Sequence, residues 1–323
     1  MSGANRVNRW GRLLPALFVV LAGCASIPPS VSELPVAGQA IELEDTPFYP
    51  QERYQCGPAA LTTVLVQSGA AATLEDMVDK VYLPGRQGSL QVELLAATRT
   101  EGRLPYVIDG SLAAIWRELE AGRPVLVLQN LGVATAIGDW SRWHYAVVVG
   151  IDAKRGEVML RSGTDRRRVT SSRTFLHTWR RGGYWGMVVL TPGELPADPD
   201  RSRYFEAVAA LEQAGRAEEA AIAWQTALGH WPGDTVALFG LANSRLLLGD
   251  YRAAEEAYRD LLQRDGSLVA ARNNLALALA GQGEYTAAMQ EIGIALSGNR
   301  DAAMERELRD TETLLRQREA GAE

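Results

Sequence analysis

The chain has 323 residues, which exceeds the size at which one hydrophobic core continues to grow, so two domains are expected. The formal net charge is -6, and the C-terminal part carries it: residues 1–200 hold 20 residues of each sign, whereas residues 201–323 hold 13 arginines and 19 acidic residues. This mild balance excludes a nucleic-acid-binding domain, which would show a clustered positive excess.

The first 23 residues have the pattern of a secretion signal. Three arginines form a positive n-region, and residues 13–22 form an apolar run that is too short to span a bilayer. The run ends in Leu-Ala-Gly-Cys at residues 21–24, which resembles the lipobox of bacterial lipoproteins; an ordinary signal peptide with an incidental cysteine is the alternative. The resemblance implies cleavage before Cys24, lipidation of Cys24 and, since no Asp follows it, an anchor on the periplasmic face of the outer membrane.

Residues 24–44 are rich in proline and small residues, and we expect them to form a tether. The only two cysteines of the chain are Cys24 and Cys56. If Cys24 is lipidated, no disulfide can form within the chain, and Cys56 is a free thiol in an oxidising compartment. Such a thiol is a liability unless it is buried or useful, so its local sequence is informative.

The next segment, residues 45–192, is predicted to fold as an α+β domain with an antiparallel sheet, because helical patterns precede strand patterns without alternation. Helix-spaced apolar residues are followed by β-branched apolar runs bounded by turn residues. The helices are expected over residues 58–68, 73–82, 90–99 and 112–121, and the strands over residues 124–129, 144–151, 157–161 and 184–190. The Pro- and Asp-rich residues 193–202 are expected to be a linker.

Residues 203–300 repeat themselves with a period of 34 residues, set by three glycines. A small residue follows each glycine by five positions and a bulky residue follows it by nine, as a stacked helical hairpin needs. The pattern resembles three tetratricopeptide (TPR) repeats, with a capping helix over residues 301–323; a plain amphipathic bundle is the alternative. The resemblance implies an all-α solenoid that binds a protein partner in its groove. The recurring residues are Gly215, Gly249 and Gly283; Ala220, Ala254 and Ala288; and Trp224, Tyr258 and Ile292.

Residues 51–61 read Gln-Glu-Arg-Tyr-Gln-Cys-Gly-Pro-Ala-Ala-Leu and are the most informative stretch for chemistry. A cysteine at the start of a helix, followed by glycine and a helix-initiating proline, has its sulfur at the positive end of the helix dipole, which stabilises a thiolate. A nearby imidazolium would lower the thiol pKa further. An upstream glutamine can add its side-chain amide to the backbone N–H of Cys56 to form an oxyanion hole.

The candidate base is His144, which opens an apolar strand 88 residues after Cys56. A histidine on a strand can meet a cysteine at the start of a helix across the cleft between them. His177 and His230 lack this setting and are expected to be structural or surface residues. Nearby tryptophans, including Trp143 and Trp179, are expected to line the cleft or to lie in the core, and residues 166–168, three arginines, are expected to form a solvated turn.

The order Gln, Cys-Gly-Pro-Ala-Ala and His-Tyr-Ala-Val-Val-Val-Gly-Ile-Asp resembles the bacteriocin-processing cysteine peptidases, papain-like domains that cleave double-glycine leaders. The resemblance covers residues 46–190. It implies Cys56 as the nucleophile, His144 as general base and acid, and Gln51 as the oxyanion donor. In that family the glutamine lies six residues before the cysteine, whereas Gln51 lies five before it, and the adjacent Gln55 is the less favourable alternative.

The family also places an Asp or Asn at the end of the following strand, where it orients the imidazole. A hairpin that turns at residues 153–156 would bring residues 162–165 opposite His144. Asp165 is the nearest acid there and Ser162 is the residue in register, while Asp152 is too far away. The third catalytic residue is therefore Asp165, Ser162 or absent.

These motifs predict a membrane-anchored cysteine peptidase whose TPR repeats hold a peptide or protein substrate or partner. The alternatives are a catalytically weak or inactive peptidase-like scaffold in an envelope assembly, with Cys56 as a buried core residue, and acyl transfer at another amide or thioester. No cofactor is expected. No metal is expected either, since His, Cys and carboxylate residues do not cluster at ligand spacing.

Overall fold

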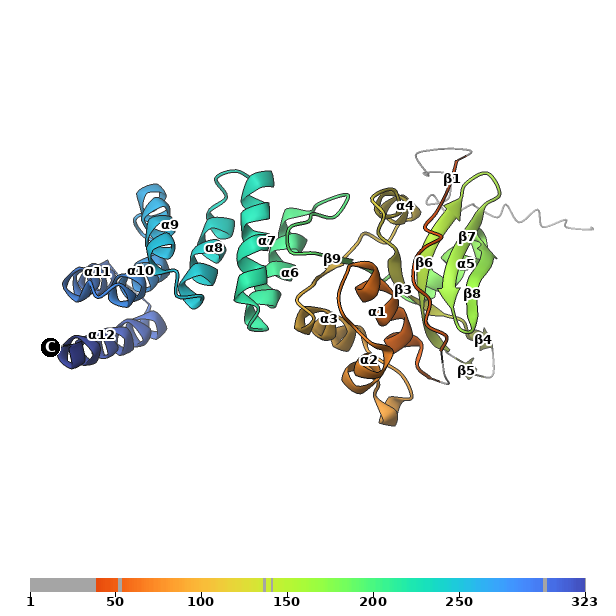
Figure 1. Ribbon diagram of the computed structural model, residues 1–323, viewed down its shortest axis with the longest axis horizontal. Coiled ribbons are helices and arrows are strands. Elements are labelled where there is room, and N and C mark those ends of the chain that lie inside the picture. The colour runs from red at the N-terminus through yellow and green to blue at the C-terminus, as the bar shows by residue number, and fades with distance from the viewer. Residues whose placement is uncertain (1–38, 52–53, 136–137, 141, 299–300, 323) are drawn as a thin grey trace, which may run out of the picture.

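The computed structural model describes residues 39–51, 54–135, 138–140, 142–298 and 301–322. The secretion signal, Cys24 and most of the expected tether lie outside these residues. Figure 1 shows a sheet covered by helices at one end of the molecule and a stack of helices that extends away from it. Within the described part of the chain, no helix combines the length and the apolar character that crossing a membrane requires.

An antiparallel sheet of seven strands organises the N-terminal domain, and its order is β2-β9-β3-β6-β7-β8, with β1 paired to the end of β6. Its strands are β1 (Ala40–Glu42), β2 (Leu104–Val107), β3 (Val125–Asn130), β6 (Trp143–Asp152), β7 (Glu157–Ser162), β8 (Asp165–Ser171) and β9 (Gly186–Leu190), while β4 (Val133–Thr135) and β5 (Gly138–Trp140) form a separate ribbon. The central strands β3 and β6 are almost entirely buried, which explains their β-branched, apolar sequences.

Helices cover both faces of this sheet, and β6 shows why. Side chains of a strand alternate between the two faces. Tyr145 and Val147 belong to the core that includes α1, whereas Ala146 and Val148 belong to the core on the opposite face. The first core also includes residues of α1 (Cys56–Gln67), α2 (Leu74–Val81) and α3 (Gln91–Thr100), and the second includes residues of α4 (Leu112–Glu120) and α5 (Ser172–Arg181).

The predicted α+β class with an antiparallel sheet is confirmed, and the four predicted helices and four predicted strands lie within a few residues of their expected positions. The interpretation of residues 166–168 as a solvated turn was wrong, because they lie in β8. This edge strand is exposed along most of its length, so it has no apolar alternation, and its hydrogen bonds to β7 define it. Residues 40–44, expected in the tether, belong to the sheet domain through β1.

A buried arginine fixes the segment that leads to the candidate site. Arg161 on β7 is 4% exposed, and its guanidinium donates hydrogen bonds to the backbone carbonyls of Glu44 (2.8 Å) and Thr46 (3.2 Å). A third bond runs to the carbonyl of Arg166 at 2.7 Å. Because backbone carbonyls rather than a carboxylate surround this cation, burial lowers its pKa. Residues 44–46 are therefore held against β7 a few residues before Gln51.

The described residues from Arg201 onward form the seven helices α6 to α12. These helices stack side by side (Figure 1). Six of them follow one another as the three hairpins α6/α7, α8/α9 and α10/α11, and α12 closes the stack. The helices are α6 (Arg201–Gln213), α7 (Ala217–His230), α8 (Thr235–Leu247), α9 (Tyr251–Arg264), α10 (Val269–Gly281), α11 (Tyr285–Gly298) and α12 (Ala302–Ala322).

The three recurring glycines end the first helix of each hairpin. Gly215, Gly249 and Gly283 have φ values of 77°, 76° and 84°, in the left-handed region that favours glycine. In each case the N–H of the next residue bonds to a carbonyl five residues earlier, which closes the helix end. The recurring small and bulky residues lie in the interface between helices and are buried, as the repeat pattern predicts: Ala220, Ala254, Ala288, Trp224, Tyr258 and Ile292.

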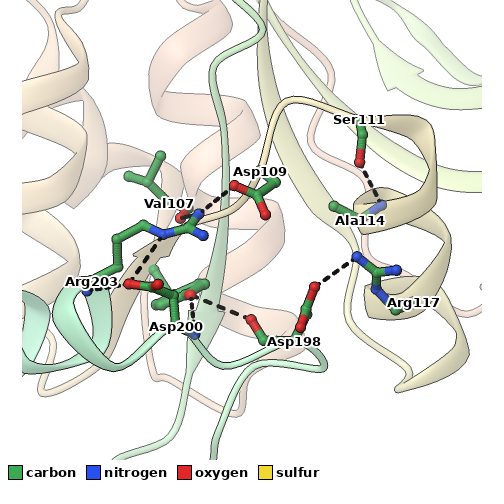
Figure 2. Close-up of polar contacts among 9 residues, drawn as sticks. Val107, Asp109, Ser111, Ala114, Arg117, Asp198, Asp200 and Arg203 are labelled. Atoms are coloured by element: carbon green, nitrogen blue, oxygen red, sulfur yellow. Dashed lines mark hydrogen bonds and ion pairs between the residues drawn. The ribbon is translucent and has the colours of Figure 1, made fainter. Parts of the chain in front are cut away.

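The residues of the expected linker, 193–202, are docked on the sheet domain (Figure 2). Arg117 on α4 pairs with Asp198 at 2.8 Å, and Arg203 on α6 pairs with Asp109 at 2.9 Å. Asp200 caps α6 by accepting a hydrogen bond from the N–H of Arg203 at 2.9 Å. These contacts join the loop before α4, α4 itself and the start of α6.

The first hairpin of the stack also shares a hydrophobic core with the sheet domain. Trp116 of α4 and Leu104 of β2 belong to the same buried cluster as Tyr204, Phe205 and Trp224 of the first hairpin. A continuous apolar interface of this kind opposes independent motion of the two parts. The first repeat is therefore fixed relative to the sheet.

Glu118 is the most buried carboxylate of this interface, and it generates a testable prediction. It is 2% exposed and accepts hydrogen bonds from Arg123 (2.7 Å) and from the backbone N–H of Ala197 (2.8 Å). Glu118→Gln leaves Arg123, only 17% exposed, without its counter-charge. We expect the free energy of unfolding in urea to fall by about 2 kcal/mol. We also expect faster limited proteolysis within residues 193–202.

The matched control is Glu120→Gln at the exposed end of the same helix, which is expected to change the free energy of unfolding by less than about 0.5 kcal/mol. Equal effects of the two substitutions would contradict the role assigned to Glu118.

Candidate active site

A cavity of ≈ 870 Å³ lies where the start of α1 meets β6 and the end of β7. Gln51, Cys56, His144 and Ser162 line it. The tertiary structure thus brings together residues that are up to 111 positions apart in the sequence. Asp165 is not among the residues that line this cavity.

Helix α1 directs its N-terminal amides toward this cavity. Residues 57–65 of the helix are all buried, so its position is determined by packing on every side. The residue before it, Gln55, makes no side-chain hydrogen bond to the first turn, whereas Thr73 and Ser111 cap α2 and α4 in this way. The first N–H groups of α1 therefore keep their hydrogen-bonding capacity for the cysteine sulfur or for a ligand.

The glycine after Cys56 is required by close packing. A Cβ atom at Gly57 would lie 2.4 Å from the Oγ atom and 2.6 Å from the Cβ atom of Ser89, distances that no side chain could occupy without a shift. Ser89 lies just before α3 and lines the same cavity. Glycine at position 57 thus lets this segment approach the start of α1.

Cys56 is partly buried, and desolvation of its thiol raises the pKa above the ordinary value for a thiol. The nearby backbone N–H groups of Tyr145, Gly57 and Cys56 itself lower the pKa, but desolvation is the larger effect. The sequence predicts a thiolate stabilised by the helix dipole and an imidazolium; the amides are present, yet they do not compensate for the loss of water. The resting sulfur is a thiol at neutral pH.

The amide of Tyr145 also locates the sulfur relative to the candidate base. The N–H of Tyr145 acts on the pKa of the sulfur, so Cys56 lies near the backbone of β6 one residue after His144. In the described part of the chain, no hydrogen bond joins the Cys56 and His144 side chains. The two side chains share one cavity and do not form an ion pair at rest.

The His144 imidazole is neutral at neutral pH. Its Nε2 atom lies 2.8 Å from the Oγ atom of Ser162, which leaves Nδ1 as the second ring nitrogen. Burial lowers the pKa of His144 to about 4, and the positive charges of Arg168 and Arg142 contribute in the same direction. A neutral imidazole is the protonation state that can accept a proton.

Asp165 does not reach the imidazole, so its assignment as the orienting residue has to be corrected. Strand β7 ends at Ser162, and Gly163, with φ 65°, turns the chain back into β8. Asp165 opens β8, where it pairs with Ser162 and is exposed. The sequence-based register assumed that residues 162–165 continue alongside β6. The hairpin instead leaves Ser162 beside His144.

The glutamine of the cavity is Gln51. Its backbone N–H donates a hydrogen bond to the carbonyl of Gly163 at 3.1 Å, which fixes it beside the β7–β8 turn. Gln55 immediately precedes α1 and is not among the residues that line the cavity. With the five-residue spacing, Gln51 and Cys56 therefore still line the same cavity.

The sequence did not predict the arginines at this site. Arg142 and Arg168 line the cavity together with Trp143, whose side chain is 56% exposed. By contrast, Trp179 is fully buried in the core. The alternation of side chains along β8 could have identified Arg168, but only if residues 165–171 had been recognised as a strand.

Comparisons with known proteins agree with these features. Residues 43–186 match the family described as Peptidase_C39 like, and residues 239–301 match the tetratricopeptide repeat. No curated protein matches the chain.

Three solved structures resemble parts of the chain. A C39-like peptidase from Bacillus anthracis is 16% identical, with coverage of 47% of this chain and 98% of that chain and a TM-score of 0.38. A thermophilic TPR protein from Thermus thermophilus is 23% identical, covering 36% of this chain and 64% of that chain with a TM-score of 0.33. The TPR domain of Sgt2 from Aspergillus fumigatus is 20% identical, covering 39% and 85% with a TM-score of 0.34.

The two family matches cover the two parts of the molecule that the fold distinguishes, the helix-covered sheet and the helical stack. The chain therefore consists of a C39-like peptidase domain followed by tetratricopeptide repeats.

Proposed function

We propose that the protein is a cysteine peptidase in which Cys56 is the nucleophile and His144 is the general base. The observation that supports this proposal is the cavity that holds both residues with Gln51, while the uncapped start of α1 and the N–H of Tyr145 face the sulfur. A nucleophile, a base and amide donors around one cavity are the components that acyl transfer requires.

In this mechanism His144 acts as a general base at the moment of attack, because the resting site holds a thiol and a neutral imidazole. As the sulfur bonds to the carbonyl carbon of the substrate, Nδ1 of the imidazole accepts the thiol proton. The backbone N–H of Cys56 and the side-chain amide of Gln51 donate hydrogen bonds to the oxyanion. The imidazolium then gives its proton to the leaving amine, and water hydrolyses the thioester with His144 again as the base.

Ser162 orients the base in this proposal. Its hydroxyl contacts Nε2 of His144, so the ring plane is held while Nδ1 stays available to the sulfur. A hydroxyl supplies orientation without the negative charge that an aspartate would add. The pKa of the imidazole accordingly remains low, at about 4.

A second candidate function is a peptidase-like binding module without catalysis. The observation that favours it is the direction of the two pKa shifts, because a raised thiol pKa and a lowered imidazole pKa both oppose proton transfer from sulfur to nitrogen. The two candidates share the same cavity and the same resting protonation. They differ in whether a bound peptide is hydrolysed.

The TPR repeats support protein or peptide binding. We propose that they hold the substrate or a partner, and that their fixed first hairpin sets the distance from this groove to the cavity. We also propose export and lipidation at Cys24 on the outer membrane, supported by the Leu-Ala-Gly-Cys motif at residues 21–24. Metabolic labelling with palmitate would show whether Cys24 carries a lipid.

Removing the nucleophile or the base tests the proposed chemistry. Cys56→Ala and His144→Ala are each expected to lower kcat for peptide hydrolysis by at least about 10³-fold, because the two residues act as a unit. The measurement is cleavage of a fluorogenic peptide mixture by the full chain. The control is His177→Ala on the exposed side of α5, which should leave the rate unchanged. Unchanged hydrolysis in Cys56→Ala, or no hydrolysis in the wild type, would favour the binding module.

The pH dependence of Cys56 alkylation tests the resting protonation state. With a raised thiol pKa, the rate of reaction with iodoacetamide should rise continuously with pH, with a midpoint above the ordinary value of about 8.5. Peptide hydrolysis should fail below pH about 4, where His144 becomes protonated and can no longer accept the thiol proton. A plateau of the alkylation rate between about pH 5 and pH 8 would instead indicate a thiolate–imidazolium pair.

A pair of substitutions separates the two candidates for the orienting residue. Ser162→Ala removes the hydrogen bond to Nε2 of His144 and is expected to lower kcat roughly tenfold, the effect of about one hydrogen bond. Asp165→Asn is expected to have no effect, since Asp165 is exposed and outside the cavity. The opposite ranking of the two variants in steady-state kinetics would restore the assignment of Asp165.

A further inference from the structure

The cavity at Cys56 is lined by positively charged side chains. Of the described residues that line it, four are arginines and none is an aspartate or glutamate. They come from four separate segments of the chain: Arg86 after α2, Arg142 before β6, Arg168 in β8 and Arg181 at the end of α5. The excess of positive charge is therefore a product of the tertiary structure.

These arginines differ in the partners that their guanidinium groups have within the protein. Arg181 donates hydrogen bonds to the backbone carbonyls of Asn130 and Gly132, so it has a structural role beside β3. Arg142 and Arg168 are exposed, and their guanidinium groups have no ion pair or hydrogen bond within the described part of the chain. The guanidinium of Arg86 is likewise exposed and has no ion pair or hydrogen bond among the described residues, so three arginines at the cavity have donors available for a ligand.

The neighbour of Arg168 shows that this arrangement is not general along β8. Arg167 forms two hydrogen bonds with the carboxylate of Glu42, at 2.8 Å and 2.9 Å. Successive side chains of a strand point to opposite faces, so Arg167 and Arg168 face different surroundings. The charge at position 167 is neutralised within the fold, and the charge at position 168 is left at the cavity.

The positive charges also act at the reacting groups. Arg168 and Arg142 both lower the pKa of His144, which shows that their electrostatic field reaches the imidazole. A cleft lined by one sign of charge concentrates ligands of the opposite sign and raises their rate of association. Trp143, exposed at the same cavity, offers an apolar surface for the uncharged part of such a ligand.

We propose that this site selects acidic peptides, with aspartate or glutamate near the bond that faces Cys56, and that Arg142 and Arg168 determine the preference. This inference rests on the proposed function, because the nucleophile, base and amide donors define the ligand as a peptide. The carboxylates of the peptide replace the counter-charges that the chain itself provides to Arg167 but not to Arg142 or Arg168.

Binding to the full-length Cys56→Ala variant tests the preference without cleavage. The probes are three fluorescein-labelled decapeptides of alanine and glycine that carry two central aspartates, asparagines or lysines. Because each exposed arginine contributes about threefold to fivefold, we expect the aspartate peptide to bind roughly tenfold more tightly than its asparagine counterpart in fluorescence anisotropy. The ratio should fall as sodium chloride is raised to about 0.5 M. Equal affinity for the two peptides would overturn the proposal.

Substitutions on the same background assign the preference to residues. Arg142→Gln and Arg168→Gln are each expected to reduce the ratio of aspartate to asparagine affinity about threefold. Arg167→Gln removes the same charge one position away and should keep the ratio. Thermal denaturation checks that every variant is folded. A ratio that falls only in Arg167→Gln would refute the assignment. A single-stranded oligonucleotide serves as a second anionic probe, and tighter binding of this oligonucleotide than of the aspartate peptide would also refute it.

Hydrolysis of the same peptides by the wild type separates this inference from the proposed function. Selective binding of the aspartate peptide without any cleavage would support the inference and refute the peptidase. Cleavage of all three peptides with equal kcat/KM would refute the inference and support the peptidase. Preferred cleavage of the aspartate peptide that is lost in Arg168→Gln would support both.

Discussion

The packing of α1 against β6 is the constraint on which the rest of the site depends. Residues 57–65 of α1 are buried, so packing fixes the helix relative to the sheet. The uncapped first turn of the helix lies beside the start of β6. There the sulfur of Cys56 meets the N–H of Tyr145, the residue after His144. Displacing the helix would separate Cys56 from His144 and from the nearby amides, because no hydrogen bond joins the two side chains in the described part of the chain.

The same packing sets the protonation of the site. Burying α1 brings the sulfur out of water, and the cost of placing a charge there exceeds the stabilisation from three backbone amides. Arg168 and Arg142 also lower the pKa of His144, because their positive charges disfavour a charged imidazole. Both reacting groups are consequently neutral at rest, and charge separation would have to occur with the substrate present. In the proposed mechanism, the unpaired arginines and the backbone amides near the sulfur would face the negative charge that develops on the substrate.

The repeats do not form a separate body attached through a flexible linker. The first hairpin shares buried residues with α4 and β2, and the docked residues before α6 add ion pairs and the buried Glu118 to this interface. A rigid junction gives the first repeat a defined position relative to the cavity. An extended linker would provide only a raised local concentration.

The sequence by itself determined the two parts of the chain, the α+β class and the repeat period, and it proposed Cys56 and His144 as the candidate pair. Local patterns of apolar residues, glycines and a helix-initiating proline express these features directly. Only the tertiary structure decided that Ser162, rather than Asp165, contacts His144, since this depends on where β7 turns back at Gly163. It also decided the direction of the Cys56 pKa shift and the gathering of arginines from separate segments. Burial and convergence are properties of packing between distant residues, and no local pattern encodes them.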